Sequence, residues 1–240
     1  MSLNLCQSSN GYRYSIDSFL LADFCTSPKS SRILDLGSGC GIISILLSMS
    51  FPQSKITGIE IQSELIMLAN QNILNNRLKE KICFIHGDIR EILKYFINEE
   101  FEVVVTNPPY YRIGDGRINP HFGKASSRHE IIGSLRDFIG AAEKVLRPKG
   151  SFYIIYTAKR ATELIYECIK FGLEPKIIRN VHSKRDSDAN LILLKAIKMG
   201  RIGLKILPPV YLFKKNGKYT NEAERILKKW RFLSAKTNLH

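Results

Sequence analysis

The chain lacks the long apolar runs and the leader pattern of membrane and secreted proteins. No segment of its 240 residues approaches the roughly 18 consecutive apolar residues that a membrane-spanning helix needs. The N-terminal stretch MSLNLCQSSNGYRYSIDSF has tyrosines and polar residues where a secretory signal has its apolar segment. These absences predict a cytoplasmic protein without membrane contact.

Cysteine and histidine patterns that hold metals or disulfides are also missing. The five cysteines are odd in number and far apart, with no CxxC pair, so neither a disulfide framework nor a zinc site is indicated. The histidines, among them His86, His121, His182 and His240, show no ligand spacing. We therefore expect reduced thiols and no bound metal.

Acidic residues are scarce, above all near the C-terminus. The whole chain has 36 Lys and Arg against 22 Asp and Glu, a formal net charge of +14. From Lys176 to His240 there are sixteen basic residues and four acidic ones. Because Lys and Arg release counterions when they neutralise phosphates, a polyanion is the first partner to consider. The alternative is a solvated basic surface on an ordinary protein.

The middle of the chain has the alternation of an α/β protein with one main core. From residue 31 to about residue 198, apolar runs of strand length alternate with segments of helical period. The predicted strands are 32–36, 55–60, 82–86, 101–106, 151–157, 175–181 and 189–197. The predicted helices lie near 41–50, 62–76, 89–98, 130–146 and 158–171. Gly150 and Gly172 are expected at helix C′ positions, which favour glycine.

The last two predicted strands are joined by HSKRDSD, which is too short for a crossover helix, so the two strands should pair antiparallel. A parallel sheet closed by an antiparallel hairpin resembles the Rossmann-like fold of class I methyltransferases, where the seventh strand lies antiparallel beside the fifth. The resemblance implies a mostly parallel, seven-stranded α/β sheet with a C-terminal antiparallel hairpin.

A glycine-rich loop follows the first predicted strand. In ILDLGSGCGIISILL, Asp35 is followed by Gly37, Gly39 and Gly41 and then by an apolar helix. Small residues let the backbone approach a nucleotide, and the helix N-terminus offers free N–H groups. The spacing is GxGxG rather than the GxGxxG of dinucleotide enzymes. Moreover, a carboxylate at Asp35 can bind an ammonium, as carried by methionine, but would repel a pyrophosphate.

Two more acids stand at predicted strand ends. Glu60 closes the second strand, where a carboxylate can accept hydrogen bonds from ribose hydroxyls. Asp88 follows the third, where it could accept the exocyclic amine of adenine, although helix capping explains it equally well. Together with the glycine loop, these acids resemble the class I S-adenosylmethionine-dependent methyltransferases, which implies S-adenosylmethionine as the cofactor.

The fourth predicted strand, FEVVVT, ends in Asn107, Pro108, Pro109 and Tyr110. Ligands of open α/β sheets bind at the carboxyl ends of strands, so this tetrad should face the cofactor methyl. A planar amino nitrogen is a poor nucleophile because its lone pair is delocalised, and two acceptors aimed at its N–H bonds favour the reactive pyramidal form. Asn107 and the rigid Pro108 carbonyl can supply these acceptors, and Tyr110 can stack on a flat acceptor. The alternative is a proline turn that merely ends the strand.

The tetrad resembles motif IV of the amino-methyltransferases, which leaves adenine, guanine, cytosine and glutamine open as acceptors. Nearly the whole chain resembles the bacterial tRNA adenine-N6 methyltransferases, which modify the adenine beside the anticodon of valine tRNA. The similar segments are GYRYSIDSFLLADF, DLGSGCGIISILL, IEIQSELIMLANQNILNN, TNPPYY, SSRHE, LRPKGSFYIIY and LKILPPVYLFKKNGKYTNEAERIL. The alternatives are a glutamine methyltransferase acting on release factors, another RNA or DNA amino-methyltransferase, and a non-catalytic RNA-binding protein.

Three segments are expected: an N-terminal cap (1–30), a methyltransferase domain (31–200) and a basic C-terminal extension (201–240). The cap should cover the cofactor pocket, with Tyr14 or Asp17 near it. The loop from Tyr110 to about His129 has no periodic pattern and is longer than most connections, which indicates a functional or disordered loop.

The basic extension should bind RNA. LFKKNGKYT has the pattern of a hairpin with Asn216 and Gly217 at its turn, and Thr220 can cap a following helix. Ser127 and Glu130 match a capping box. Because single-stranded loops are recognised through stacking and phosphate contacts, a tRNA anticodon loop is the expected partner of a monomer or weak dimer. The predicted RNA contacts are Arg128, Lys214, Lys215, Lys228, Lys229 and Arg231.

Overall fold

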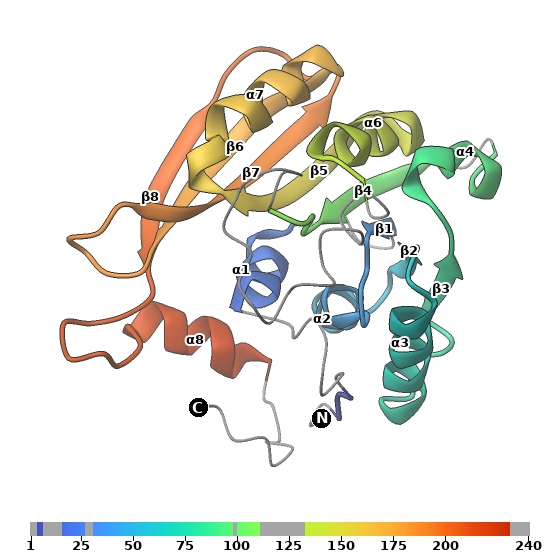
Figure 1. The fold of residues 1–240 in the computed structure, drawn as a ribbon, viewed down its shortest axis with the longest axis horizontal. Coiled ribbons are helices and arrows are strands. Elements are labelled where there is room, and N and C mark those ends of the chain that lie inside the picture. Colours follow the sequence, from blue (N-terminus) through green and yellow to red (C-terminus); the bar gives the residue numbers. More distant parts are fainter. Residues whose placement is uncertain (1–3, 7–15, 27–30, 98–99, 111–132, 231–240) are drawn as a thin grey trace, which may run out of the picture.

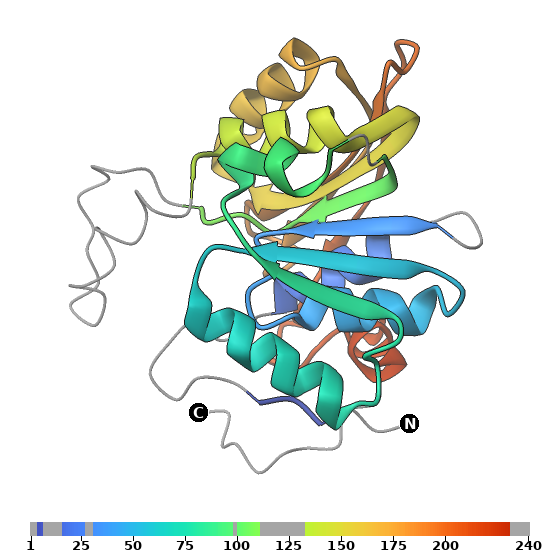
Figure 2. The same ribbon diagram turned by 90° about the vertical axis from the view of Figure 1, so that its right-hand side faces the viewer.

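The computed structural model describes residues 4–6, 16–26, 31–97, 100–110 and 133–230. One mixed sheet runs through the molecule, with helices on both of its faces (Figures 1 and 2). The strands are β1 Arg32–Leu36, β2 Lys55–Glu60, β3 Ile82–His86, β4 Phe101–Thr106, β5 Leu146–Thr157, β6 Leu173–His182, β7 Ala189–Lys198 and β8 Lys205–Tyr211. The α-helices are α1 Ile16–Phe24, α2 Ile42–Ser50, α3 Ser63–Asn75, α4 Ile92–Tyr95, α6 Leu135–Val145, α7 Ala161–Lys170 and α8 Asn221–Lys229. Short 3₁₀ turns, η1 Ile89–Glu91 and η3 Ala158–Arg160, precede α4 and α7.

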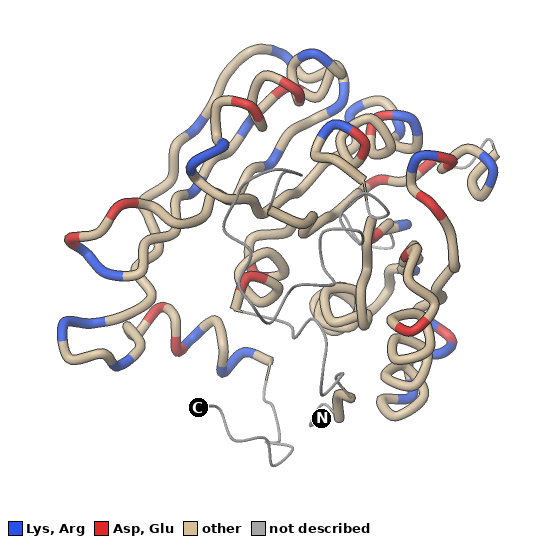
Figure 3. The backbone as a smooth tube through the Cα atoms, in the orientation of Figure 1, with Lys and Arg blue, Asp and Glu red and all other residues tan. Residues whose placement is uncertain are grey.

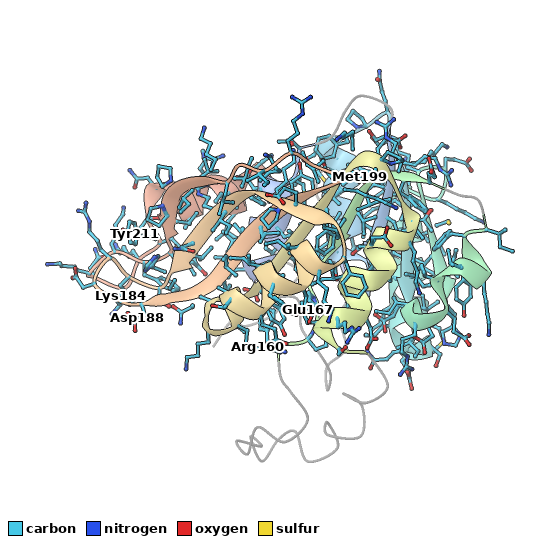
Figure 4. The ribbon with its side chains drawn as sticks, turned by 90° about the horizontal axis from the view of Figure 1, so that it is seen from above. Arg160, Glu167, Lys184, Asp188, Met199 and Tyr211 are labelled. Atoms are coloured by element: carbon cyan, nitrogen blue, oxygen red, sulfur yellow. The ribbon has the colours of Figure 1, made fainter. Side chains whose placement is uncertain are left out.

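The strand order is β3-β2-β1-β4-β5-β7-β6-β8. β1 to β5 pair in parallel, whereas β7 lies antiparallel between β5 and β6. The mostly parallel sheet and its antiparallel hairpin are therefore confirmed. In Figure 4, β7 can be followed from the turn that carries Lys184 and Asp188 to its other end beside Met199.

The prediction of seven strands is wrong, because β8 adds an eighth strand parallel to β6. Its sequence, KILPPVY, contains Pro208 and Pro209, which cannot donate a backbone hydrogen bond to a sheet. Such residues are tolerated at a sheet edge, and β8 occupies the edge of this sheet. The two prolines therefore make β8 hard to predict from the sequence, but they do not prevent the strand from forming.

The prediction that Gly150 follows a helix is also wrong. β5 starts at Leu146, directly after α6, so Gly150 lies inside the strand, and it is Lys149 that takes a left-handed φ of 64°. A Cβ at Gly150 would lie 2.9 Å from the Arg147 carbonyl, so close backbone approach explains the glycine. Gly172 does have the left-handed φ expected after α7, at 71°.

The helices differ from their predicted bounds in two places. α6 begins at Leu135, later than expected, because Ser134 and Asp137 form a capping box across its first turn. The helix predicted over 89–98 is reduced to η1 and the single turn of α4. The capping box predicted at Ser127 and Glu130 lies outside the described residues.

Helices α1, α2, α3 and α8 lie on one face of the sheet, and α4, α6 and α7 lie on the other (Figure 2). Phe19 and Leu20 of α1 share a buried cluster with Ile226 and Trp230 at the C-terminal end. Burying side chains of this size stabilises a fold by about 2 kcal/mol each, so α1 and α8 are tied to the same core. Within the described residues, no helix is both long and apolar enough to cross a membrane.

The strand order reverses between β1 and β4, since the chain continues outward from β1 to β2 and from β4 to β5. Leu36 and Thr106 pair at the carboxyl ends of these neighbouring strands, and the Thr106 hydroxyl donates to the Leu36 carbonyl at 2.8 Å. The loops after β1 and β4 therefore start side by side. In open α/β sheets, this reversal point is where ligands bind.

Candidate active site

The loop between β1 and α2 depends on left-handed backbone at three glycines. Gly37, Gly39 and Gly41 have φ values of 67°, 56° and 82°, which side chains other than glycine rarely adopt. A Cβ at Gly41 would lie 2.5 Å from the Phe84 ring, so space also requires glycine there. A Cβ at Gly39 would meet no atom within 4 Å. The backbone at Gly39 thus borders open space that a ligand can occupy.

Glu60 at the end of β2 holds this loop in place. Its carboxylate accepts the N–H of Gly39 at 3.0 Å through one oxygen and the N–H of Gln62 at 2.9 Å through the other. The side chain is only 4% exposed. Because each carboxylate oxygen has more than one lone pair, Glu60 retains capacity to accept ligand hydroxyls as well.

Asp35 is fully buried beneath the loop and only partly satisfied. Its Oδ2 accepts the Ser44 hydroxyl at 2.7 Å, whereas Asp35 Oδ1 and the buried Ser38 hydroxyl have no hydrogen-bond partner among the described residues. Burial raises the pKa of Asp35 to about 7, although hydrogen bonds from Ser44 oppose the shift. A ligand ammonium would satisfy the Oδ1 atom, so these residues fit a cofactor that carries an amino-acid end.

Asp88 caps η1, which confirms the capping interpretation. Its carboxylate accepts the backbone N–H of Arg90 at 2.9 Å and also binds the Arg90 guanidinium, with a shortest contact of 2.5 Å. Burial alone would raise the pKa of Asp88, but the hydrogen bonds and charge of Arg90 outweigh burial and lower it. Its contact with an adenine amine stays a prediction.

The tetrad directly follows β4, and its side chains are packed rather than free. Pro108 is buried, whereas Asn107, Pro109 and Tyr110 are half-buried. The Tyr110 hydroxyl lies 2.8 Å from Oδ1 of Asn107 and 2.9 Å from Oδ2 of Asp17. The asparagine predicted to orient an acceptor nitrogen is thus linked through the Tyr110 hydroxyl to Asp17 of helix α1.

Tyr156, near the end of β5, and Arg160 of η3 hold Tyr110 from another side. The Tyr110 and Tyr156 rings meet edge to face, with centroids 5.7 Å apart, and Arg160 donates to the Tyr110 carbonyl at 3.4 Å. Arg160 also donates to the Tyr156 hydroxyl and binds both oxygens of Glu163. Tyr156 and Arg160 are not among the site residues predicted from the sequence. They could have been found from the parallel pairing of β4 and β5, because the two strands end at the same edge of the sheet.

The predicted hairpin and helix of the C-terminal extension are confirmed. Phe213 and Tyr219 pair antiparallel across the turn with their rings stacked 4.9 Å apart, and Gly217 has a left-handed φ of 78°. The Thr220 hydroxyl caps α8 by accepting the Ala223 N–H at 3.2 Å. Arg128, Arg231 and Tyr14 lie outside the described residues.

The four described lysines predicted to contact RNA lie on the hairpin and on α8, where basic positions recur along the backbone, with acidic ones among them on α8 (Figure 3). Lys214 donates to Asn221 at 2.9 Å, Lys228 pairs with Glu224 at 2.8 Å, and Lys229 pairs with Asp23 of α1 at 2.9 Å. Lys215 is exposed. Intramolecular partners thus take up part of this charge.

Among the described residues, no group of three or more His, Cys, Asp or Glu could hold a metal ion.

Solved structures share this fold. A predicted O-methyltransferase from Agrobacterium tumefaciens superposes with a TM-score of 0.72 at 20% identity, covering 92% of this chain and 100% of that one. At that identity the likeness concerns the fold alone. Together with the glycine loop and its partly satisfied acid, it defines a Rossmann-like methyltransferase fold.

The family model of the methyltransferase small domain matches residues 14–171, and the chain belongs to this family. The protein is therefore a methyltransferase, and S-adenosylmethionine is its methyl donor. Similar curated proteins include the tRNA1(Val) (adenine(37)-N6)-methyltransferase of Pedobacter heparinus, 25% identical over 177 residues and 74% of each chain. The protein of the same name from Shewanella halifaxensis is 26% identical over 220 residues and 88% of each chain.

Proposed function

We propose that this methyltransferase transfers a methyl group to the exocyclic N6 of an adenine in tRNA, beside the anticodon of valine tRNA. The observation that carries the proposal is the place of Asn107 and Pro108 on β4, next to the glycine loop on β1. That position brings two oxygen acceptors to the edge of the sheet where the methyl donor of this family binds.

The proposed chemistry is mainly positioning. Asn107 Oδ1 and the Pro108 carbonyl accept the two N–H bonds of the target nitrogen, which favours the pyramidal form that has a free lone pair. Pro109 fixes the Pro108 carbonyl because the residue before a proline is conformationally restricted. When bound, S-adenosylmethionine supplies an electrophilic methyl on its sulfonium. The methylated nitrogen then loses its proton without a strong base, so correct alignment supplies much of the rate.

The glycine loop and the acids around it are proposed to hold the methyl donor. Asp35 binds the ammonium of its methionine part, Glu60 accepts its ribose hydroxyls, and Gly37, Gly39 and Gly41 admit it closely. Asp88 is proposed to lie near its adenine. Asn107, which faces the methyl, belongs to both the donor site and the acceptor site.

RNA as the acceptor is supported by the names of the similar proteins and by the charge of the chain. The extension over 201–240 is proposed to contact the anticodon loop, with the segment 1–30 as a cap over the domain at 31–200. The proposed contacts are Arg128, Lys214, Lys215, Lys228, Lys229 and Arg231. We also propose a cytoplasmic protein, because tRNA is found there, and a monomer or weak dimer.

Nucleoside mass spectrometry of total tRNA from a strain lacking the protein tests this function. The expected result is loss of N6-methyladenosine from one tRNA and its return when the purified protein and S-adenosylmethionine are added. Unchanged tRNA nucleosides, with radiolabel from S-adenosylmethionine entering a release factor instead, would establish the glutamine methyltransferase. A protein that binds RNA and transfers no methyl group would be the non-catalytic alternative.

A further inference from the structure

The Tyr110 hydroxyl lies between two oxygen acceptors from distant parts of the chain. Asp17 Oδ2 is 2.9 Å away on α1, and Asn107 Oδ1 is 2.8 Å away after β4. A tyrosine hydroxyl has one proton and can donate a good hydrogen bond to only one of these atoms at a time. Asp17 and Asn107 therefore compete for the proton of Tyr110.

Both sides of this contact are held by other parts of the fold. Asp17 lies in the first turn of α1, where the helix dipole favours a carboxylate, and the residues that follow it on α1, from Ser18 to Ala22, are buried. On the other side, Tyr156 packs against the Tyr110 ring and Arg160 binds its carbonyl. Figure 4 shows Arg160 at the start of α7. The short distances are thus a built arrangement and not a chance meeting of surface side chains.

This inference rests on the function proposed above, in which the competition for the Tyr110 proton affects methyl transfer. The target nitrogen needs Asn107 Oδ1 as an acceptor, and a hydrogen bond from Tyr110 would occupy one of the two lone pairs of that oxygen and weaken it as an acceptor for the incoming N–H. An ionised carboxylate is a stronger acceptor than an amide oxygen. We propose that Asp17 is a positioning residue that takes the Tyr110 proton, so that Asn107 Oδ1 is available to the target nitrogen.

Single-turnover methylation of saturating tRNA tests this role. Asp17→Ala should slow methyl transfer about tenfold, the effect expected of one competing hydrogen bond. Calorimetry should show unchanged affinity for S-adenosylmethionine. Asp17→Asn, which keeps an acceptor oxygen, should retain most of the rate. Asp23→Ala on the same helix is the matched control, because it removes an acid that pairs with α8 and should leave the rate unchanged.

The decisive variant is the double substitution Asp17→Ala with Tyr110→Phe. Removing the Tyr110 hydroxyl abolishes the competition, so the double variant should recover most of the rate lost by Asp17→Ala alone. If Asp17 merely anchored α1, Tyr110→Phe could not restore that loss. A double variant as slow as Asp17→Ala would therefore overturn the proposal.

A second measurement needs no acceptor and separates this inference from the proposed function. The side-chain carbonyl carbon of Asn107, labelled with ¹³C, moves downfield in NMR spectra when its oxygen accepts a hydrogen bond. Asp17→Ala should shift this signal downfield, and adding Tyr110→Phe should reverse the shift. An unchanged signal in Asp17→Ala would overturn the role of Asp17 whatever the acceptor is. A wild-type protein with the expected shifts but no RNA methylation would overturn only the proposed acceptor.

Discussion

Glu60 Oε2 accepts the backbone N–H of Gly39 at 3.0 Å, which links the end of β2 to the loop that follows β1. Glu60→Gln should lower the affinity for S-adenosylmethionine at least about tenfold. In this variant an amide NH₂ replaces one carboxylate oxygen, so one of the two backbone N–H groups that Glu60 accepts would face another donor. Isothermal calorimetry measures the change. The exposed Glu64→Ala on α3 is the control and should bind normally. Equal affinity in the wild type and Glu60→Gln would refute this role.

Gly39 and Gly41 should respond differently to alanine, although both have left-handed φ values. Gly41→Ala adds a Cβ 2.5 Å from the Phe84 ring and should cost about 2–4 kcal/mol of unfolding free energy, from overpacking and backbone strain together. Gly39→Ala meets no atom within 4 Å and should cost only about 1–2 kcal/mol, from strain. Its larger effect should be on binding of S-adenosylmethionine, because the Cβ enters the open space beside the loop. Urea unfolding and calorimetry measure the two effects, and equal destabilisation by both would contradict the assignment.

The pKa of Asp35 makes the stability of the cofactor-free protein depend on pH. Burial raises this pKa from 3.8 to about 7, so between these values the folded state keeps a proton that the unfolded state has lost. The contribution of Asp35 to stability therefore falls as pH rises from about 4 to 7 and is constant above that range. Asp35→Asn has no such titration. The difference in unfolding free energy between wild type and Asp35→Asn should follow this curve, and a flat difference would show that Asp35 is ionised throughout.

The same pKa couples cofactor binding to proton release. An ammonium beside Asp35 favours the ionised carboxylate, so binding of S-adenosylmethionine below pH 7 should release a proton, and affinity should rise between pH 5.5 and 7 by up to about tenfold per pH unit. Calorimetry in buffers of different ionisation enthalpy counts the protons released. Binding at pH 6 without proton release would exclude contact between the ammonium and Asp35.

The alternation of strands and helices was enough to place Asp35, Glu60 and Asn107 at one edge of the sheet, because parallel strands joined by crossovers end at the same side. Local sequence patterns do not predict features that depend on tertiary packing. Strand β8 was not predicted because it contains two prolines, which only an edge strand tolerates. Similarly, the contact between Asp17 and Tyr110 spans 93 positions and depends on how α1 packs, which no local pattern encodes.

Asn107→Ala should reduce methyl transfer at least about a hundredfold, as expected for loss of a hydrogen-bond group that acts in the transition state. Affinity for tRNA should be unchanged, since Asn107 contributes orientation rather than phosphate contacts. Single-turnover kinetics and filter binding measure the two quantities separately. Equal methyl transfer by wild type and Asn107→Ala would show that the tetrad takes no part in the mechanism. A non-catalytic RNA-binding protein would show no methyl transfer in either form.

The basic hairpin and α8 give a prediction about salt and charge. If they contact phosphates, affinity for tRNA should fall steeply between roughly 50 and 200 mM salt, because binding releases counterions. Charge reversal at Lys215 and Lys228 together should weaken binding and flatten this dependence. The matched control reverses Lys79 and Lys144, which are exposed elsewhere on the molecule, Lys144 on α6 across the sheet from α8. Equal losses in the two double variants would mean that net charge, and not the surface of the C-terminal extension, determines RNA affinity.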